Sequence, residues 1–155
     1  MLIYPSRIDT DQTLLLDQEL PSSILKLDEP LARQHGPVKV NLTVTRDGET
    51  LLVTGQVGTL LHLRCGRCAE WIDWPVSVPN FILLIEPPFP DIIDLTPYIR
   101  EDILLDLPVV ASCRLDSSGC CPLTGKIYLP AGEPPPITGQ DAWKELDKLK
   151  DRTKE

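Results

Sequence analysis

The residues of this sequence that are best suited to chemistry are its cysteines, which fall into two groups. Cys65 and Cys68 form a C-x-x-C pair, and the glycine between them lets the turn tighten so that both sulfurs can point at one place. That is the local geometry of half a zinc knuckle. The sequence therefore predicts a metal site, and zinc is the expected metal.

The downstream cysteines supply the remaining ligands that a tetrahedral site needs. Cys113 is followed by the adjacent pair Cys120 and Cys121. Neighbouring residues rarely both bind one metal ion comfortably, so one member of this pair is expected to be spare. We expect Cys113 and Cys121 to join Cys65 and Cys68 in a four-thiolate site.

Two other interpretations of the C-x-x-C pair stay open. The cysteines can be small buried apolar residues that bind nothing. Alternatively they can form a thiol redox pair, but thioredoxin-like chemistry places the pair at a helix N-terminus, where the dipole lowers the thiol pKa. Here the pair follows one expected strand and precedes another, which favours a metal site over redox chemistry.

No set of catalytic residues accompanies the cysteines in the sequence. A Ser/His/Asp set, a phosphate-binding loop and an H-E-x-x-H motif are all missing, and the carboxylates are scattered. His35 and His62 are isolated in the sequence, and we interpret both as solvated surface residues. We therefore expect a protein that is not an enzyme.

Composition and charge limit the class of protein further. The chain has 155 residues and a formal net charge of -8, which predicts one ordinary acidic domain. Neutralisation of phosphates drives most nucleic-acid affinity, so RNA contact is expected through a local patch or a protein partner. The N-terminus resembles no signal peptide and no run is long enough to span a membrane, so we expect a cytoplasmic protein without membrane partners.

The clearest structural signal is a hairpin. Residues 38–45 alternate apolar and polar side chains with period two, and Asp47-Gly48 follows as a strong turn dipeptide. The return strand runs up to Cys65, so the C-x-x-C pair lies on the turn that follows it. Further strands are expected at residues 70–78 and 81–85, which together make an antiparallel meander.

Helices are expected to cover this sheet, so the predicted class is α+β. Asp94-Leu95-Thr96-Pro97 reads as a cap and first turn, and Pro108 ends the helix. Trp143, Leu146 and Leu149 indicate a C-terminal helix. The expected order is a strand-containing segment (1–36) packed on a β-rich core with the cysteines (37–129), a proline-rich connector (130–139), and a C-terminal helix and tail (140–155).

Taken together, these motifs resemble the YceD family, bacterial and plastid proteins implicated in the accumulation of 23S ribosomal RNA. The resemblance covers roughly residues 37–150. It is carried by Cys65-Gly66-Arg67-Cys68, by the run from Asp94 to Pro108, and by Cys113 with the segment from Gly119 to Gly125. Ser117 and Thr124 stand where fuller members of the family have cysteines, so a separate downstream four-thiolate site cannot form.

The resemblance implies a non-enzymatic factor for 23S ribosomal RNA accumulation in large-subunit biogenesis. Its expected partner is ribosomal RNA or a pre-ribosomal particle, reached through a ribosomal protein or a local patch. Candidate contact residues are Arg64 and Arg67 beside the knuckle, and Arg100. The alternatives are a structural zinc-binding module for protein–protein interaction with no ribosomal role, and the thiol redox protein described above.

Overall fold

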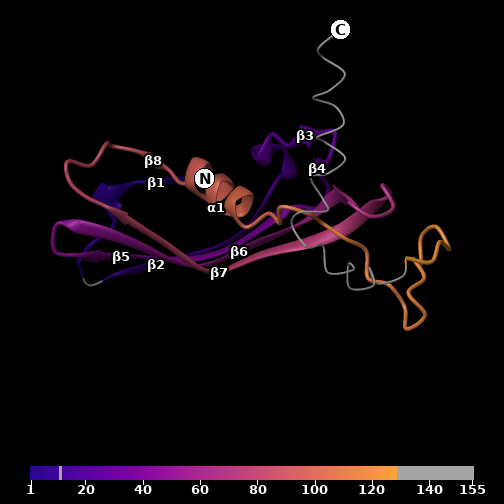
Figure 1. The fold of residues 1–155 in the computed structure, drawn as a ribbon. Coiled ribbons are helices and arrows are strands. Elements are labelled where there is room, and N and C mark those ends of the chain that lie inside the picture. The colour runs from indigo at the N-terminus through magenta and orange to yellow at the C-terminus, as the bar shows by residue number, and fades with distance from the viewer. Residues whose placement is uncertain (11, 129–155) are drawn as a thin grey trace, which may run out of the picture. The chain divides into compact units, whose positions relative to one another are not determined.

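The computed structural model describes residues 1–10 and 12–128, which belong to an α+β fold. The chain divides into two compact units, Met1–Cys113 and Arg114–Glu155. Within the described part of the first unit, six strands form an antiparallel sheet and one α-helix packs against it (Figure 1). The predicted α+β class is therefore confirmed. The expected connector and C-terminal helix, at 130–139 and 140–155, lie outside the described residues.

The predicted hairpin is present. Strand β5 (Val38–Asp47) pairs with strand β6 (Thr50–Arg64), and Asp47 faces Thr50 across the turn. Gly48 has a φ of +59°, which a glycine adopts without the steric penalty of a Cβ. Along β5 the apolar positions are buried and the intervening ones are largely open to solvent, so the period-two pattern identifies the core face.

Strand β7 (Trp71–Ile85) pairs with the other edge of β6 over nearly its whole length. Two shorter strands were expected here, at 70–78 and 81–85. The structure joins them, because residues 79–80 form a bulge: Gly55 pairs with Phe81, but Val57 pairs with Val78. One extra residue switches the side-chain parity, so even positions face the core before the bulge and odd positions face it afterwards.

The N-terminal segment completes the sheet. Strand β2 (Thr13–Leu20) pairs with β5, while β3 (Asp28–Glu29) and β4 (Ala32–Gln34) extend the sheet from β6. Two 3-10 turns, η1 (Pro5–Arg7) and η2 (Ser22–Leu25), link these elements. Strand β1 (Leu2–Ile3) forms a separate two-stranded sheet with β8 (Ile93–Asp94). Residues 1–36 thus belong to the same compact unit as the hairpin.

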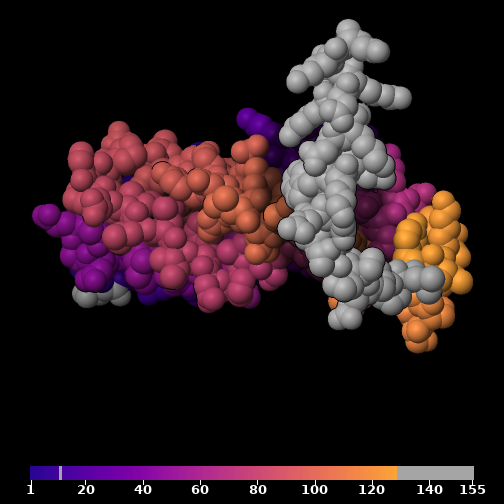
Figure 2. Space-filling view, in the orientation of Figure 1, coloured from indigo at the N-terminus to yellow at the C-terminus, as the bar shows by residue number. Residues whose placement is uncertain are grey.

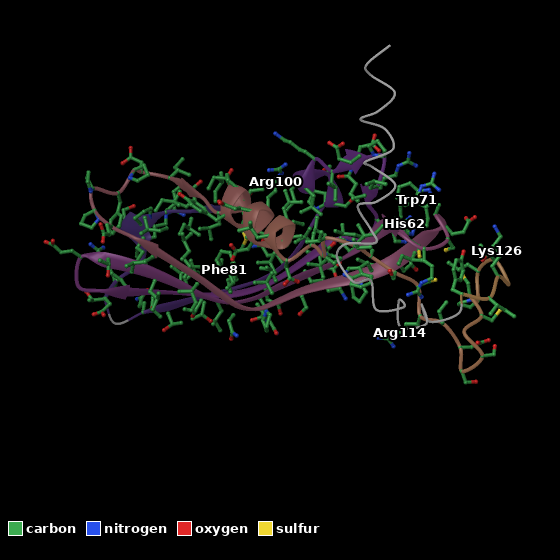
Figure 3. All side chains as sticks on the ribbon, in the orientation of Figure 1. His62, Trp71, Phe81, Arg100, Arg114 and Lys126 are labelled. Carbon is green, nitrogen blue, oxygen red and sulfur yellow. The ribbon has the colours of Figure 1, made fainter. Side chains whose placement is uncertain are left out.

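Helix α1 (Thr96–Leu105) covers one face of the sheet, as the sequence predicts for a mid-chain helix (Figure 1). Its first turn is held by Asp94, whose Oδ1 accepts a hydrogen bond from the N–H of Thr96 at 2.9 Å. Ile99 and Ile103 are fully buried on the inner side of the helix, and Phe81 lies beneath it in the core (Figure 3). Residues from β7 through α1, pink to orange, form much of the visible surface of this unit (Figure 2).

Among the described residues, no helix combines the length and apolar character that a membrane crossing requires.

Candidate metal centre

The turn between β6 and β7 places the C-x-x-C pair at one end of the sheet. The N–H of Cys65 donates to the carbonyl of Glu70 at 2.8 Å, and the N–H of Ala69 donates back to the carbonyl of Cys65 at 2.9 Å. Ala69 has a φ of +61°, so the chain reverses through a left-handed residue. These two hydrogen bonds close the turn around Cys68.

Gly66 has a different role from the one expected. The sequence predicts that this glycine tightens the turn, but the residue with left-handed backbone angles is Ala69. A Cβ on Gly66 would lie 2.7 Å from Cγ1 of Val110, and the N–H of Gly66 donates to the carbonyl of Ala111 at 2.8 Å. The glycine therefore allows the segment after α1 to approach the turn closely.

That close approach brings Cys113 to the C-x-x-C pair. The N–H of Cys113 donates to Sγ of Cys65 at 3.2 Å, and the N–H of Arg67 donates to the same sulfur at 3.4 Å. The Sγ atoms of Cys65, Cys68 and Cys113 all lie within 4.8 Å of one another. The C-x-x-C pair and a thiol that is distant in sequence thus form one cluster.

The cluster fits zinc chemically. Zinc held by thiolates in a tetrahedral site has Zn–S distances of ~2.3 Å, which puts neighbouring sulfurs about 3.8 Å apart. Separations within 4.8 Å therefore need only a small closure of the side chains. Cys65 and Cys113 are buried and Cys68 is half-buried, as in a structural site that is shielded from water. Soft thiolate ligands of this kind suit zinc rather than magnesium or calcium.

The environment of Cys65 favours its thiolate form. Burial raises the pKa of this thiol, but hydrogen bonds from the backbone N–H groups of Cys113, Cys68 and Arg67, and from the Cys68 side chain, together outweigh burial. The resulting pKa is lowered to about 6. A thiolate is the form that binds a metal ion, so the backbone of this turn prepares Cys65 as a ligand.

The predicted ligand Cys121 belongs to the second unit, where it occupies a turn with the same backbone pattern. Its N–H donates to the carbonyl of Lys126 at 2.8 Å, and Gly125 donates back to the carbonyl of Cys121 at 2.8 Å. Gly125 has a φ of +65°, as Ala69 does in the first turn. The position equivalent to Cys68 is Thr124, so this second turn offers one thiol instead of two.

The local geometry of this turn distinguishes Cys121 from Cys120 as the candidate fourth ligand. Cys121 is buried at the first position of the turn, whereas Cys120 is half-buried and its Sγ donates to the carbonyl of Cys121 at 3.8 Å. The N–H of Cys120 is also bound by Asp116, at 2.8 Å. Cys121 therefore occupies in its turn the place that Cys65 occupies in the first turn, and its joining the other three cysteines in one site stays a prediction.

The three candidate arginines differ in what they contact. Arg67 Nη1 donates to the carbonyl of Cys113 at 3.4 Å, and Arg100 Nε donates to the carbonyl of Leu25 at 2.8 Å. Both thus fasten one segment of the first unit to another. Arg64 hydrogen-bonds the carbonyl of Ala69, and its guanidinium lies over the Trp71 ring, 4.8 Å from the centroid. Of the three, Arg64 is the one that presents a stacked cation at the surface.

A second arginine, which the sequence analysis did not single out, also contacts the Trp71 ring. Arg33 on β4 also lies over Trp71, at 4.7 Å from the ring centroid. Arg64 and Trp71 are cross-strand partners, and Arg33 pairs with His62 two residues before Arg64 on β6. The grouping of these three side chains can be recognised only when the strand register is known. The register shows which alternate residues of neighbouring strands share one face of the sheet. We call Arg33, Arg64 and Trp71 the arginine–tryptophan stack.

A cavity of about 450 Å³ lies beside the C-x-x-C turn in the first unit. It is lined largely by apolar side chains that include Leu31, Leu63, Leu107, Val109 and Val110. Several of these are exposed, Val109 most of all. The cavity gives this end of the sheet an apolar surface next to the cysteines.

Comparison of the chain with family models, curated proteins and solved structures finds no match. The resemblance to the YceD family therefore depends on the motifs themselves.

Proposed function

We propose that this protein is a non-enzymatic factor that promotes accumulation of 23S ribosomal RNA during assembly of the large ribosomal subunit. The observation that carries the proposal is the meeting of Cys65, Cys68 and Cys113, because it joins two of the three motifs of the family resemblance in one site. The third motif, the run from Asp94 to Pro108, contains helix α1 and lies between the other two motifs in the chain.

Zinc in this site has a structural role in the proposal. When bound, it crosslinks the β6–β7 turn to the segment that follows α1. Cys65, Cys68 and Cys113 supply thiolates, and the N–H groups of Arg67 and Cys113 stabilise the negative charge on the Cys65 sulfur. Cys121 is proposed as the fourth ligand. A closed four-thiolate site leaves no open position for substrate, which agrees with a factor that catalyses nothing.

The arginine–tryptophan stack supports a local contact with RNA. Single-stranded bases stack on aromatic rings and on guanidinium planes, and cations neutralise the phosphates beside them. Arg33 and Arg64 supply cations on an otherwise acidic chain with a net charge of -8. A contact confined to this patch is compatible with that charge, whereas a broad phosphate-binding face is not.

The proposal is tested in a deletion strain complemented with variants. We expect deletion to lower the ratio of mature 23S to 16S ribosomal RNA, most clearly in the cold, and wild-type protein to restore it. A Cys65→Ser/Cys68→Ser variant should restore it poorly, while Cys120→Ser should restore it fully. An unchanged 23S to 16S ratio in the deletion strain would reject the ribosomal role.

A second candidate is a structural zinc module for a protein partner that is unrelated to ribosomes. The apolar cavity beside the cysteines, with Val109 and Val110 exposed at its rim, favours this alternative. Sedimentation of cell extracts separates the two candidates. A ribosomal factor should sediment with large-subunit precursors. A protein-binding module unrelated to ribosomes should instead be found with its partner in the light fractions.

A thiol redox protein is the third candidate, and the lowered pKa of Cys65 is the observation in its favour. The pair nevertheless follows a strand, and Cys65 is buried where a disulfide substrate cannot easily reach its sulfur. A redox role requires a reversible Cys65–Cys68 disulfide during turnover. Protein trapped with alkylating reagent in cells should show both thiols reduced or metal-bound if the proposed function is correct.

A further inference from the structure

A second group of metal-binding side chains lies on the outer face of the same sheet. His62 on β6 pairs directly with Asp73 on β7, and Leu61 and Leu63 on either side of His62 point into the core. His62 and Asp73 therefore project from the opposite face, where Nε2 of His62 lies 2.7 Å from Oδ1 of Asp73. Figure 3 shows His62 at the end of the sheet that also carries Trp71.

His35 joins this pair from the residues that follow β4. The chain is held against β6 there, because the N–H of Gly36 donates to the carbonyl of Leu60 at 2.8 Å and the Thr59 hydroxyl donates to the carbonyl of Gly36 at 3.2 Å. The rings of His35 and His62 stack with centroids 3.8 Å apart and an interplanar angle of 16°. Backbone pairing thus places both imidazoles together before any ligand arrives.

We propose that His35, His62 and Asp73 form a second metal site, for a divalent first-row transition ion such as zinc or nickel. One ligand atom from each of the three lies within 4.8 Å of the other two. Two imidazoles and a carboxylate are a donor set that suits zinc and nickel. The thiol cluster differs in that its ligands are soft thiolates, which favour zinc. The site is separate from the cysteine cluster and does not depend on the ribosomal role.

The site's chemistry follows from its hydrogen bond and its exposure. Nε2 of His62 and Oδ1 of Asp73 lie within hydrogen-bonding distance of each other, and an ion that binds both atoms would take the place of that contact. The Asp73 side chain is 62% exposed and His35 is exposed too, so both can turn toward an ion and the stacked rings can separate. The remaining coordination positions face solvent, where water or a ligand from a partner molecule can occupy them.

The charges around this site act in opposite directions on a bound cation. Arg33 is the cross-strand neighbour of His62 on β4, and its positive charge opposes a metal ion. However, its Nε lies 3.5 Å from Oδ1 of Asp28, and its guanidinium lies over the Trp71 ring. The arginine is therefore engaged away from the imidazoles, and the net charge of -8 on the chain attracts cations in general.

The test uses the full chain with its thiol site first loaded with one equivalent of zinc, verified by loss of thiol reactivity at Cys65, Cys68 and Cys113. Nickel is then titrated by calorimetry and by ¹H–¹⁵N NMR. We expect one further ion per chain and paramagnetic loss of the amide signals of residues 35, 62 and 73. His62→Gln and His35→Gln should abolish this binding, and Asp73→Asn should weaken it about tenfold or more.

Glu19→Gln is the matched control, because Glu19 on β2 is an exposed carboxylate of the same sheet that lies outside the three-residue group and does not contact Arg33 in any ion pair described above. It should leave nickel affinity within about twofold of wild type. The proposal is overturned if no second ion binds, if His62→Gln binds as wild type does, or if Glu19→Gln weakens binding as much as Asp73→Asn. Wild-type protein gives a readout that needs no variant: zinc must shift the ring ¹⁵N resonances of both histidines, and unchanged resonances also overturn the proposal.

Discussion

The backbone N–H of Cys113 donates a hydrogen bond to Sγ of Cys65 at 3.2 Å, although 48 positions separate the two residues. This contact is one of the hydrogen bonds that together outweigh burial and lower the pKa of Cys65, and it brings a third thiol to the C-x-x-C pair. It forms because Gly66 leaves room for Val110 and Ala111 to lie against the turn. The candidate metal centre is therefore built as much by backbone packing as by the cysteines themselves.

Removal of one thiol ligand should release zinc and destabilise the first unit. We expect Cys113→Ser to lower the zinc content of protein purified without chelator to well below one ion per chain, and to lower the melting temperature measured by calorimetry. A chelator should lower the melting temperature of the wild type similarly. Cys121→Ser tests the fourth ligand in the same way.

The matched control for these variants is Cys120→Ser, whose thiol is half-buried beside Cys121. It should retain full zinc content. If Cys113→Ser keeps its zinc as well, or if wild-type protein contains none, the thiol cluster binds no metal and its cysteines serve only in packing.

Truncation of Phe81 should be costly because the bulge in β7 aims this ring into the core. Its side chain is 1% exposed, so Phe81→Ala should lower the free energy of unfolding by about 3–5 kcal/mol in urea denaturation. Leu84 on the same strand is 55% exposed, and Leu84→Ala should change that free energy by about 0.5 kcal/mol or less. Equal costs for the two variants would contradict the parity switch at residues 79–80.

Asp94 should contribute stability that disappears in acid. Hydrogen bonds from the Thr96 hydroxyl and from the Thr96 N–H lower the pKa of Asp94 to about 2, against about 3.9 in an unfolded chain. Since the folded-state pKa is the lower one, the contribution is complete above about pH 4 and is lost as the pH falls toward 2. The side chain is 49% exposed, so solvent screening keeps the effect to about 1 kcal/mol or less.

Asp94→Asn isolates this charge, because asparagine keeps an oxygen acceptor for Thr96 but does not titrate. Urea unfolding of both proteins should show a difference in free energy at pH 6 that shrinks steadily below pH 4. A difference that stays constant down to the acid limit of folding would show that the ionised carboxylate is not what stabilises the start of α1.

The arginine–tryptophan stack should govern association with large-subunit precursors. We expect Trp71→Ala and Arg64→Ala each to move the protein from precursor fractions toward the top of a sucrose gradient, and the wild-type association to weaken as salt is raised. Arg7, which lies over the Tyr4 ring at 4.8 Å, offers a matched cation–aromatic pair elsewhere in the first unit. Arg7→Ala should sediment as wild type does; a loss as large as that of Arg64→Ala would mean that the effect is nonspecific.

Several features of this protein are determined locally and were predictable from the sequence. The alternation of residues 38–45 and the Asp47-Gly48 turn encode the hairpin, because both signals act within a few residues. Asp94, Thr96 and Pro97 likewise mark the start of the mid-chain helix. The approach of Cys65 to Cys68 was likewise indicated by their spacing, since two cysteines three positions apart on one turn can point their sulfurs at one place.

Only the tertiary structure decided which distant residues meet. The bulge at residues 79–80 joins two expected strands into one. The sequence pattern did not predict this continuity, because apolar and polar residues alternate regularly within each half by itself. His35 and His62 are isolated in the sequence, because cross-strand neighbours can be far apart along the chain. The register of β4, β6 and β7 brings both histidines to Asp73. The same register brings Arg33 and Arg64 to Trp71. Strand register is a sum of many weak contacts across the whole sheet, so a short stretch of sequence does not contain it.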